Sequence, residues 1–190
     1  MGEVVVNKSS LKSSEFDVAV VGAGAAGLAT AIFAARRMPE CQIVALDGAK
    51  KLGAKILVAG GGRCNVTNVR VQAADFWGGS RNTIKQVLAA FSAEAAVDFF
   101  REIGVEMHVE EHGKFFPNTN SAKTVLAALL AEAGHRGVSL AVDHRVLEIN
   151  KSDDGFLVKT SQGAILARAV VLATGGKSLP KTGSDGSGYA

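Results

Sequence analysis

Hydrophobic positions in this chain fall into short continuous runs, typical of buried strands, and into segments with helical spacing. The first run, DVAVV over residues 17–21, leads through a glycine turn into the alanine-rich helical stretch AAGLATAIFAARR. The second run, CQIVALD, spans residues 41–47. A strand, a helix and a second strand in this order predict an α/β domain with a parallel sheet.

The middle of the chain alternates between helices and short strands. It predicts two helices over Asn82–Ile103, the second with Ser92 as its N-cap, a hairpin over Glu106–Phe116, a helix from Ser121 to Gly137 and a buried strand over Val138–Val142. Three strands then follow closely, over His144–Lys151, Gly155–Thr160 and Ala164–Arg168, and a separate apolar strand covers Ala169–Thr174. The turns Asp153-Asp154-Gly155 and Gln162-Gly163 are strong hairpin signals. A three-stranded meander in place of a crossover helix is typical of FAD domains of the glutathione reductase class.

The glycine turn carries a dinucleotide-binding motif. Gly22, Gly24 and Gly27 stand in the spacing G-x-G-x-x-G between strand and helix, and Asp47 closes the second strand. Gly22 allows the tight turn, Gly24 lets the backbone approach a pyrophosphate, and Gly27 allows close helix packing. The pyrophosphate would lie on the N–H groups at the helix start, Ala25 and Ala26. An acid beside the ribose favours FAD or NAD over NADP. A tight turn that binds nothing would account for Gly22 and Gly27, but not for Gly24 and Asp47 together.

A second glycine motif, GGGRCNVTN over residues 60–68, follows a basic segment that includes Lys55. Three consecutive glycines expose backbone to a flat ligand, and Arg63, Asn65, Thr67 and Asn68 supply hydrogen-bonding groups beside it. A plain surface loop is the alternative, because glycine and asparagine mark turns. We favour the wall of an isoalloxazine site.

With these motifs the chain resembles the bacterial BaiN/YhiN-type flavoproteins, a family of NAD(P)/FAD-dependent oxidoreductases that includes aminoacetone oxidase-like proteins. The matching runs are LDGAKKLGAKILVAGGGRCNVTN, GKFFPNTNSAKTVLAALL and ATGGKSLPKTGSDGSGYA, and the similarity extends from Phe16 to the last residue. Two positions depart from the family pattern: Asp47 stands where Glu is usual, and Ala59 where Ser is usual.

The resemblance implies an FAD site in which Ala173–Gly176 lie against the cofactor and Val146 contacts the adenine through its backbone. The expected cofactor-binding residues are Gly22, Gly24, Ala25, Ala26, Gly27, Asp47, Gly48, Lys55, Gly61, Gly62, Arg63, Cys64, Asn65, Val146, Ala173, Thr174, Gly175 and Gly176. Family members are longer, so the resemblance also implies an N-terminal fragment that stops inside the helix opening at residues 186–190. We expect a disordered tail over residues 1–14 and an FAD-binding domain over residues 15–190, truncated before the substrate domain.

Composition and charge narrow the class of protein. Hydrophobic residues make up 47%, and the net charge of +3 comes without a basic stripe interleaved with aromatics, so we expect no nucleic-acid partner. The first 14 residues lack a signal-peptide core, and no run approaches the roughly 18 apolar residues of a membrane span. A cytoplasmic protein without a membrane partner is therefore expected. The four histidines match no metal-ligand spacing, and His108 and His112 are interpreted as solvated.

The cysteines also bear on mechanism. Cys41 opens the second strand and is interpreted as a small buried residue. A C-x4-C dithiol relay is excluded for Cys64, because the fifth residue after it is Val69. Packing, with a backbone N–H directed at the cofactor, is the favoured role of Cys64, and a reactive thiol near the flavin is the alternative.

The sequence predicts an FAD-dependent oxidoreductase in which the flavin accepts hydride or electrons from a small organic substrate or from NAD(P)H. Arg63 and Asn65 would stabilise charge on the reduced ring. No catalytic base, substrate or oligomeric state follows from the residues. Three alternatives stay open: an NAD-dependent dehydrogenase, a flavin-dependent nucleic-acid-modifying enzyme, and a truncated, inactive dinucleotide-binding module.

Overall fold

The computed structural model describes residues 11, 14–178, 180–182, 185, 186 and 188. Most of the predicted tail, and most of the predicted helix opening at the chain end, lie outside these residues. The described chain forms two compact units, one from residues up to Lys55 together with those from Leu129, the other from Ile56–Ala128. The single FAD-binding domain over residues 15–190 stays a prediction.

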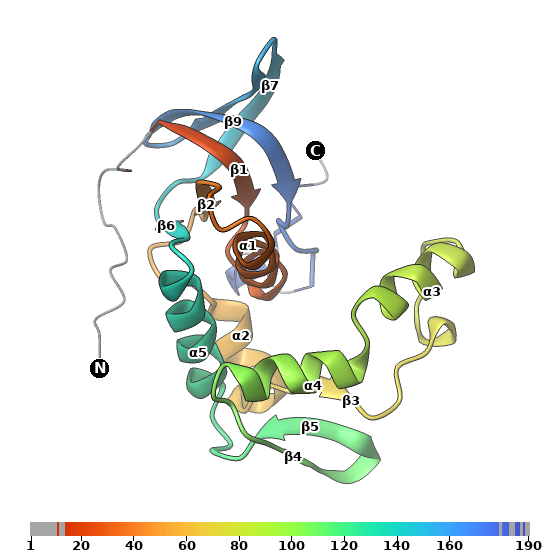
Figure 1. Cartoon of the computed structure of the whole chain (residues 1–190). Coiled ribbons are helices and arrows are strands. Elements are labelled where there is room, and N and C mark those ends of the chain that lie inside the picture. The colour runs from red at the N-terminus through yellow and green to blue at the C-terminus, as the bar shows by residue number, and fades with distance from the viewer. Residues whose placement is uncertain (1–10, 12–13, 179, 183–184, 187, 189–190) are drawn as a thin grey trace. The chain divides into compact units, whose positions relative to one another are not determined.

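The first unit is built on a six-stranded sheet with the order β6-β2-β1-β9-β8-β7 (Figure 1). Its strands are β1 (Glu15–Val21), β2 (Ile43–Leu46), β6 (Ser139–Ala141), β7 (Val146–Ser152), β8 (Gly155–Thr160) and β9 (Gly163–Leu172). Strands β6, β2, β1 and β9 are parallel, whereas β7, β8 and β9 form an antiparallel meander. The predicted fold class, a Rossmann-like sheet with a three-stranded meander, is confirmed.

The last strand corrects one prediction. Ala164–Arg168 and Ala169–Thr174 were expected as two strands, but the structure has one strand of ten residues, β9. No turn residue separates Arg168 from Ala169, so the chain stays extended. Its first half pairs with β8, and the stretch from Leu166 to Leu172 pairs with β1. The third strand of the meander is thus also the strand that returns to the parallel sheet.

Helix α1 (Ala25–Arg37) buries one face, made by Gly27, Leu28, Ala31, Ile32 and Ala35. These positions recur every three to four residues, which places them along a single stripe of the helix. Val20, Val44 and Leu46 on the neighbouring strands are fully or almost fully buried. The apolar core of this unit therefore fixes α1 on the sheet, with its first turn beside the end of β1.

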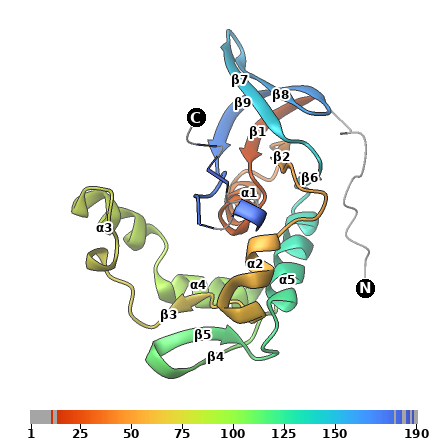
Figure 2. The ribbon, with the colours of Figure 1, turned by 180° about the vertical axis from the view of Figure 1, so that it is seen from behind.

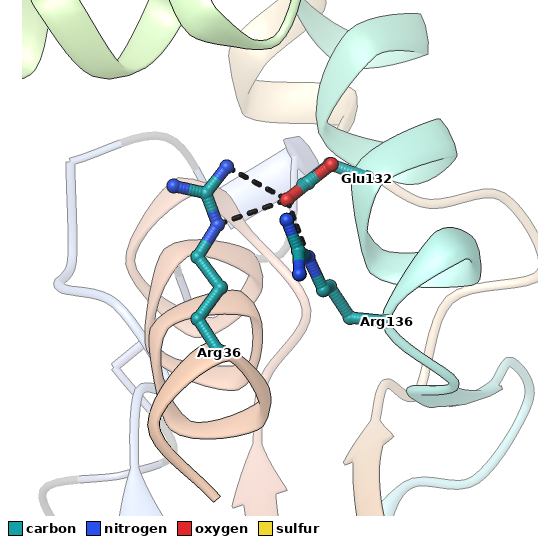
Figure 3. Close-up of polar contacts among 3 residues, drawn as sticks. All are labelled: Arg36, Glu132 and Arg136. Atoms are coloured by element: carbon teal, nitrogen blue, oxygen red, sulfur yellow. Dashed lines mark hydrogen bonds and ion pairs between the residues drawn. The ribbon is translucent and has the colours of Figure 1, made fainter. Parts of the chain in front are cut away.

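Two arginines converge on one glutamate at the far end of α1 (Figure 3). Arg36 donates to Glu132 Oε1 from Nε at 2.9 Å and from Nη2 at 2.7 Å, and Arg136 Nε donates to the same oxygen at 2.9 Å. Glu132 lies on α5 (Ala122–His135), and its side chain is 12% exposed. Burial raises the pKa of Glu132, but the hydrogen bonds from Arg136 and Arg36 outweigh it, so the pKa is lowered overall. The group therefore links α1 to α5 as an ionised cluster.

We expect Glu132→Gln to lower the free energy of unfolding by about 2 kcal/mol, because Arg36 and Arg136 both lose the anion that accepts their hydrogen bonds, at a carboxylate whose side chain is mostly buried. Asp98→Asn is the matched control: the Asp98–Arg101 pair is more than half exposed on both sides, and its loss should cost less than about 0.5 kcal/mol. A carboxylate whose folded pKa is lowered stabilises the fold above its unfolded pKa, and that contribution disappears as pH falls through the folded value. The difference between wild type and Glu132→Gln in urea titrations should therefore shrink below about pH 4. Equal effects of the two substitutions at neutral pH would contradict this role.

The second unit contains short helices and a small sheet (Figure 2). Its elements are α2 (Ala54–Val58, from Ile56 onward), the 3-10 turn Ala59–Gly62, β3 (Thr67–Asn68), the 3-10 turn Ala73–Asp75, α3 (Arg81–Ala90), α4 (Ala93–Glu102), β4 (Met107–Val109), the 3-10 turn Glu111–Gly113, β5 (Lys114–Pro117) and the start of α5. The sheet has the order β3-β5-β4 and is antiparallel.

Several local predictions are confirmed. Ser92 caps α4, because its hydroxyl accepts from the Ala95 N–H at 3.1 Å, and β4 and β5 form the expected hairpin. Cys41 is a correction: it is only partly buried and precedes β2, which begins at Ile43. Within the described residues no helix has both the length and the apolar character needed to cross a membrane.

Candidate nucleotide-binding site

The glycine turn lies where strand order in the sheet reverses. Chain neighbour β2 lies on one side of β1 and the much later β9 on the other, which is where open α/β sheets bind ligands. The Gly22 N–H donates to the Leu46 carbonyl at 2.8 Å, and the Ala173 N–H donates to the Val21 carbonyl at 2.8 Å. Gly22 has a φ of +100°, as the predicted tight turn requires. Two loops, after β1 and after β9, therefore leave the sheet side by side.

The start of α1 offers an open backbone cradle. A Cβ built on Gly24 meets no atom within 4 Å, and Gly24 has an ordinary extended conformation, with φ −77° and ψ −166°. Neither packing nor backbone strain within the described chain requires glycine here. The helix has no side-chain N-cap and no acid in its first turn, and Ala25 and Ala26 are exposed. These features suit an anionic group lying on the helix N-terminus.

Asp47 joins the end of β2 to the glycine turn. Its Oδ2 accepts from the Ala23 N–H at 2.9 Å, and its Oδ1 accepts from the Ala49 N–H at 2.9 Å. Each carboxylate oxygen has further acceptor capacity, so the same side chain can still accept from a ribose hydroxyl. The contact with Ala23, inside the motif, was not foreseen from the sequence.

We expect Asp47→Ala to weaken FAD binding by about 10- to 100-fold, the effect of one or two charge-assisted hydrogen bonds. FMN has no adenosine, so its affinity should change little. Equilibrium titration of the apoprotein with both flavins measures the difference. Asp47→Asn is the control, because it keeps one acceptor oxygen for the backbone of the turn. Equal losses for FAD and FMN would mean that Asp47 acts only on the fold.

Arg145 is a residue of this region that the sequence did not single out. A Cβ built on Gly48 would lie 3.0 Å from the Arg145 Cβ and 3.2 Å from its Nε. The Arg145 Nη2 lies 3.5 Å from Asp185 Oδ2. Gly48 thus makes room for Arg145, which immediately precedes Val146, the predicted adenine contact. The predicted cofactor-binding residues Gly48 and Val146 therefore lie near one another. The only sequence signal was a basic residue beside a predicted site residue.

The loop after β9 begins at Ala173. A Cβ on Gly22 would be 2.4 Å from the Ala173 carbonyl oxygen, and a Cβ on Gly188 would be 2.0 Å from Thr174 Oγ1. Gly175 has a φ of +78°. Lys55 Nζ donates to Ser178 Oγ at 2.7 Å, so the predicted residue Lys55 lies beside the loop that contains the predicted segment Ala173–Gly176.

The second glycine motif belongs to the second unit and forms a left-handed turn. The φ angles of Gly60, Gly61 and Gly62 are +55°, +70° and +86°, and that of Cys64 is +63°. A Cβ on Gly61 would meet no atom within 4 Å, whereas one on Gly60 would lie 2.7 Å from the Asn65 nitrogen. Gly61 and Asn65 are exposed. The run of glycines is therefore required by the backbone itself.

Cys64 is buried, and burial raises the pKa of its thiol. A raised pKa lowers the thiolate fraction at neutral pH, which favours packing over reactivity. The predicted direction of its N–H is wrong: the Cys64 N–H donates to the Ala59 carbonyl at 2.9 Å and closes the turn. Asn68 also bonds locally, donating from Nδ2 to the His112 carbonyl at 2.8 Å.

His108 is a second correction in this unit. His112 is exposed as predicted, but His108 is only partly exposed, with Nε2 3.2 Å from Glu110 Oε1 and Nδ1 3.3 Å from Asn118 Oδ1. The prediction treated both histidines as solvated and did not indicate these partners. Among the residues with described positions, no group of three or more His, Cys, Asp or Glu side chains is arranged to hold a metal ion.

The strand order, the glycine turn and the helix after it define a Rossmann-type domain. Residues 16–190 match the family described as "HI0933-like protein Rossmann domain". The chain belongs to this family, which confirms the resemblance to BaiN/YhiN-type proteins.

Two curated relatives are about equally similar to the chain. It is 34% identical over 173 residues to the 3-dehydro-bile acid delta(4,6)-reductase of Clostridium scindens, covering 91% of this chain and 42% of the relative. It is 33% identical over 174 residues to the ribosomal RNA dihydrouridine synthase of Escherichia coli, covering 92% of this chain and 43% of the relative. The chain thus spans less than half the length of these curated relatives.

Solved structures share the fold at low sequence identity. The 3-ketosteroid-delta4-(5alpha)-dehydrogenase of Rhodococcus jostii has a TM-score of 0.62 at 17% identity, with 91% of this chain and 48% of that chain covered. A flavocytochrome c3 fumarate reductase has a TM-score of 0.58 at 22% identity, with 86% and 34% covered.

Proposed function

We propose that the protein is an FAD-dependent oxidoreductase that adds hydride to a C=C bond conjugated with a carbonyl group of a small organic substrate. The carrying observation is the cradle at Gly24. Among the described residues, neither packing nor backbone conformation requires a glycine at this position. It lies at an uncapped helix start, directly after Ala23, whose N–H donates to Asp47. A pyrophosphate against the backbone supplies a reason for the glycine.

The relatives support the choice of reaction. A reductase of a 3-dehydro-delta(4,6) bile acid and a dihydrouridine synthase both carry names that describe hydrogenation of C=C bonds. In each named compound the reduced C=C is conjugated with a carbonyl. A carbonyl accepts the charge that develops when hydride adds to the far carbon, so the site needs a hydride source and stabilisation of negative charge.

The chain's residues would divide the work of holding the cofactor. The N–H groups of Ala25 and Ala26 would bind the pyrophosphate, Asp47 would accept from the ribose, and Arg63 and Asn65 would stabilise negative charge on the reduced ring. When bound, FAD supplies hydride transfer, while the protein contributes binding, orientation and electrostatics. NAD(P)H is the proposed electron donor.

A second substrate class is favoured by one observation. The relative at 33% identity is named for an RNA substrate, and its identity differs by one percentage point from that of the relative named for a bile acid. The same reduction on a uridine base is therefore the competing proposal, with RNA in place of a small molecule.

The test is run on the full-length protein. We expect the absorbance bands of an oxidised flavin and release of FAD, not FMN, on denaturation and chromatography. Under anaerobic conditions NADH or NADPH should bleach the bands, and a steroid 4-en-3-one should restore them faster than buffer does. Restoration by uridine-containing RNA alone would support the competing proposal. A colourless protein that binds NAD instead would overturn both.

A further inference from the structure

The backbone around Arg63 is held in one conformation. Its flanking residues Gly62 and Cys64 both have left-handed φ angles, +86° and +63°. The Cys64 N–H closes the turn onto Ala59, and the Val66 N–H donates to the Phe115 carbonyl on β5 at 2.9 Å. The point from which the Arg63 side chain leaves the chain is therefore fixed relative to β5, within the second unit.

The Arg63 guanidinium has two contacts with this unit. It stacks on the Phe116 ring, with Cζ 4.1 Å from the ring centroid, and Nη1 donates to Glu110 Oε1 at 2.5 Å. Phe116 is 3% exposed, and its ring fits against Gly60, where a Cβ would lie 2.9 Å from Cε1. One contact orients the plane of the guanidinium and the other its direction within that plane.

Glu110 is itself held by several hydrogen bonds. Its N–H donates to the Lys114 carbonyl at 2.8 Å, and its carbonyl accepts from the Gly113 N–H at 3.1 Å. The same carboxylate oxygen that binds Arg63 lies 3.2 Å from His108 Nε2, and His108 Nδ1 lies 3.3 Å from Asn118. The pKa of Glu110 is lowered overall, mainly by the hydrogen bond from Arg63. Desolvation acts in the opposite direction, and the hydrogen bond with His108 lowers the pKa further. Asn118, His108, Glu110 and Arg63 thus form a continuous chain of contacts.

Stability alone does not account for this arrangement. The side chains of Arg63 and Glu110 are 41% and 32% exposed, and ion pairs this exposed contribute little to the free energy of unfolding. Within the part of the chain that the structure describes, Glu110 is the hydrogen-bond partner of the guanidinium, through Nη1. The remaining N–H groups stay available to a ligand of matching shape, because arginine carries five donors in a planar fork.

We propose that Glu110 is a positioning residue, which holds the Arg63 guanidinium in the orientation that the bound cofactor requires. The inference rests on the proposed function, because it takes Arg63 to act on the flavin. Glu110 acts through Arg63 and does not itself touch the cofactor. The residues concerned are 47 positions apart in sequence.

A double-mutant cycle tests this coupling. Arg63→Met keeps an apolar stem over Phe116 and removes the charge, and Glu110→Gln keeps the shape of the carboxylate and removes its charge. We expect each single variant to weaken FAD binding by about tenfold, the effect of one charge-assisted hydrogen bond. In the double variant the loss should equal that of Arg63→Met alone, because a residue that acts through Arg63 has no effect once Arg63 is gone.

Two further measurements separate positioning from a structural role. The midpoint potential of the bound flavin should fall in Arg63→Met and in Glu110→Gln, whereas the thermal unfolding temperature of the apoproteins should stay near that of wild type. Glu111→Gln is the matched control, because this adjacent carboxylate is exposed and should change neither affinity nor potential.

Three results would overturn the inference. Losses that multiply in the double variant would mean that Glu110 acts independently of Arg63. Unchanged FAD affinity and potential in both single variants, in a protein that binds FAD, would remove the role of Arg63 while the proposed function stands. A wild-type protein that binds no FAD would overturn the proposed function and this inference with it.

Discussion

Gly24→Val is expected to abolish FAD binding while the protein stays folded. The valine side chain would enter the space beside the first turn of α1, where a Cβ meets no protein atom within 4 Å, so the apoprotein has room for it. A pyrophosphate lying on the same backbone would occupy that space, so it cannot bind beside the valine side chain. We therefore expect the affinity for FAD to fall by at least about 100-fold, as for a lost set of charge-assisted hydrogen bonds. Flavin titration and circular dichroism of the apoprotein measure the two effects.

Gly134→Val is the control for this substitution. Gly134 lies on α5 in the same unit, is exposed, and also has no atom within 4 Å of a built Cβ. It lies far from the turn in sequence and should leave FAD affinity unchanged. Unchanged flavin content in Gly24→Val would mean that the pyrophosphate does not bind at this turn.

Gly27→Ala is expected to have the largest effect on stability. Its methyl group would lie 1.7 Å from the Gly22 carbonyl oxygen and 3.4 Å from the Ala173 Cβ. The clash is with backbone, which no side-chain rotation relieves, so α1 would have to shift off the end of β1. We expect the free energy of unfolding in urea to fall by about 3 kcal/mol or more, and FAD binding to be lost with the turn.

The opposite sign is expected for Gly134→Ala. Replacing an exposed helical glycine by alanine stabilises a protein by up to about 1 kcal/mol. Comparing the two alanine variants therefore distinguishes the effect of the clash with the glycine turn from the general effect of replacing a helical glycine. A Gly27→Ala protein as stable as wild type would show that α1 can move away from Gly22 at little cost. It would also remove the structural reason for the third glycine of the motif.

The first βαβ unit was predictable because its signals are local. Strand, glycine turn, helix and acid follow one another within 31 residues, from Asp17 to Asp47, and each has a short-range physical cause. The hairpins after β7 and β8 were likewise marked by Asp-Gly and Gln-Gly turns. Ser92 was identifiable as an N-cap from its hydroxyl and the helical pattern after it.

Residues that meet only through the tertiary fold were not predictable. Arg145 lies against Gly48, about 100 positions away in sequence, and Glu110 lies against Arg63 across 47. The division into two units could not be predicted from the sequence either. One boundary lies within α2 and the other within α5, so the helical pattern continues across both. The prediction divided the unbroken β9 after Arg168, although a polar residue at one position does not end a strand.

The pairing of β1 with β9 determines when the sheet can form during synthesis. Glu15 pairs with Leu166 and Val21 with Leu172, so one edge of β1 stays without its partner until more than 150 residues have left the ribosome. The second unit is formed by residues 56–128, all of which have been synthesised well before that point. We therefore expect residues 56–128 to fold before the sheet of the first unit is complete, while the β1 edge that pairs with β9 stays exposed.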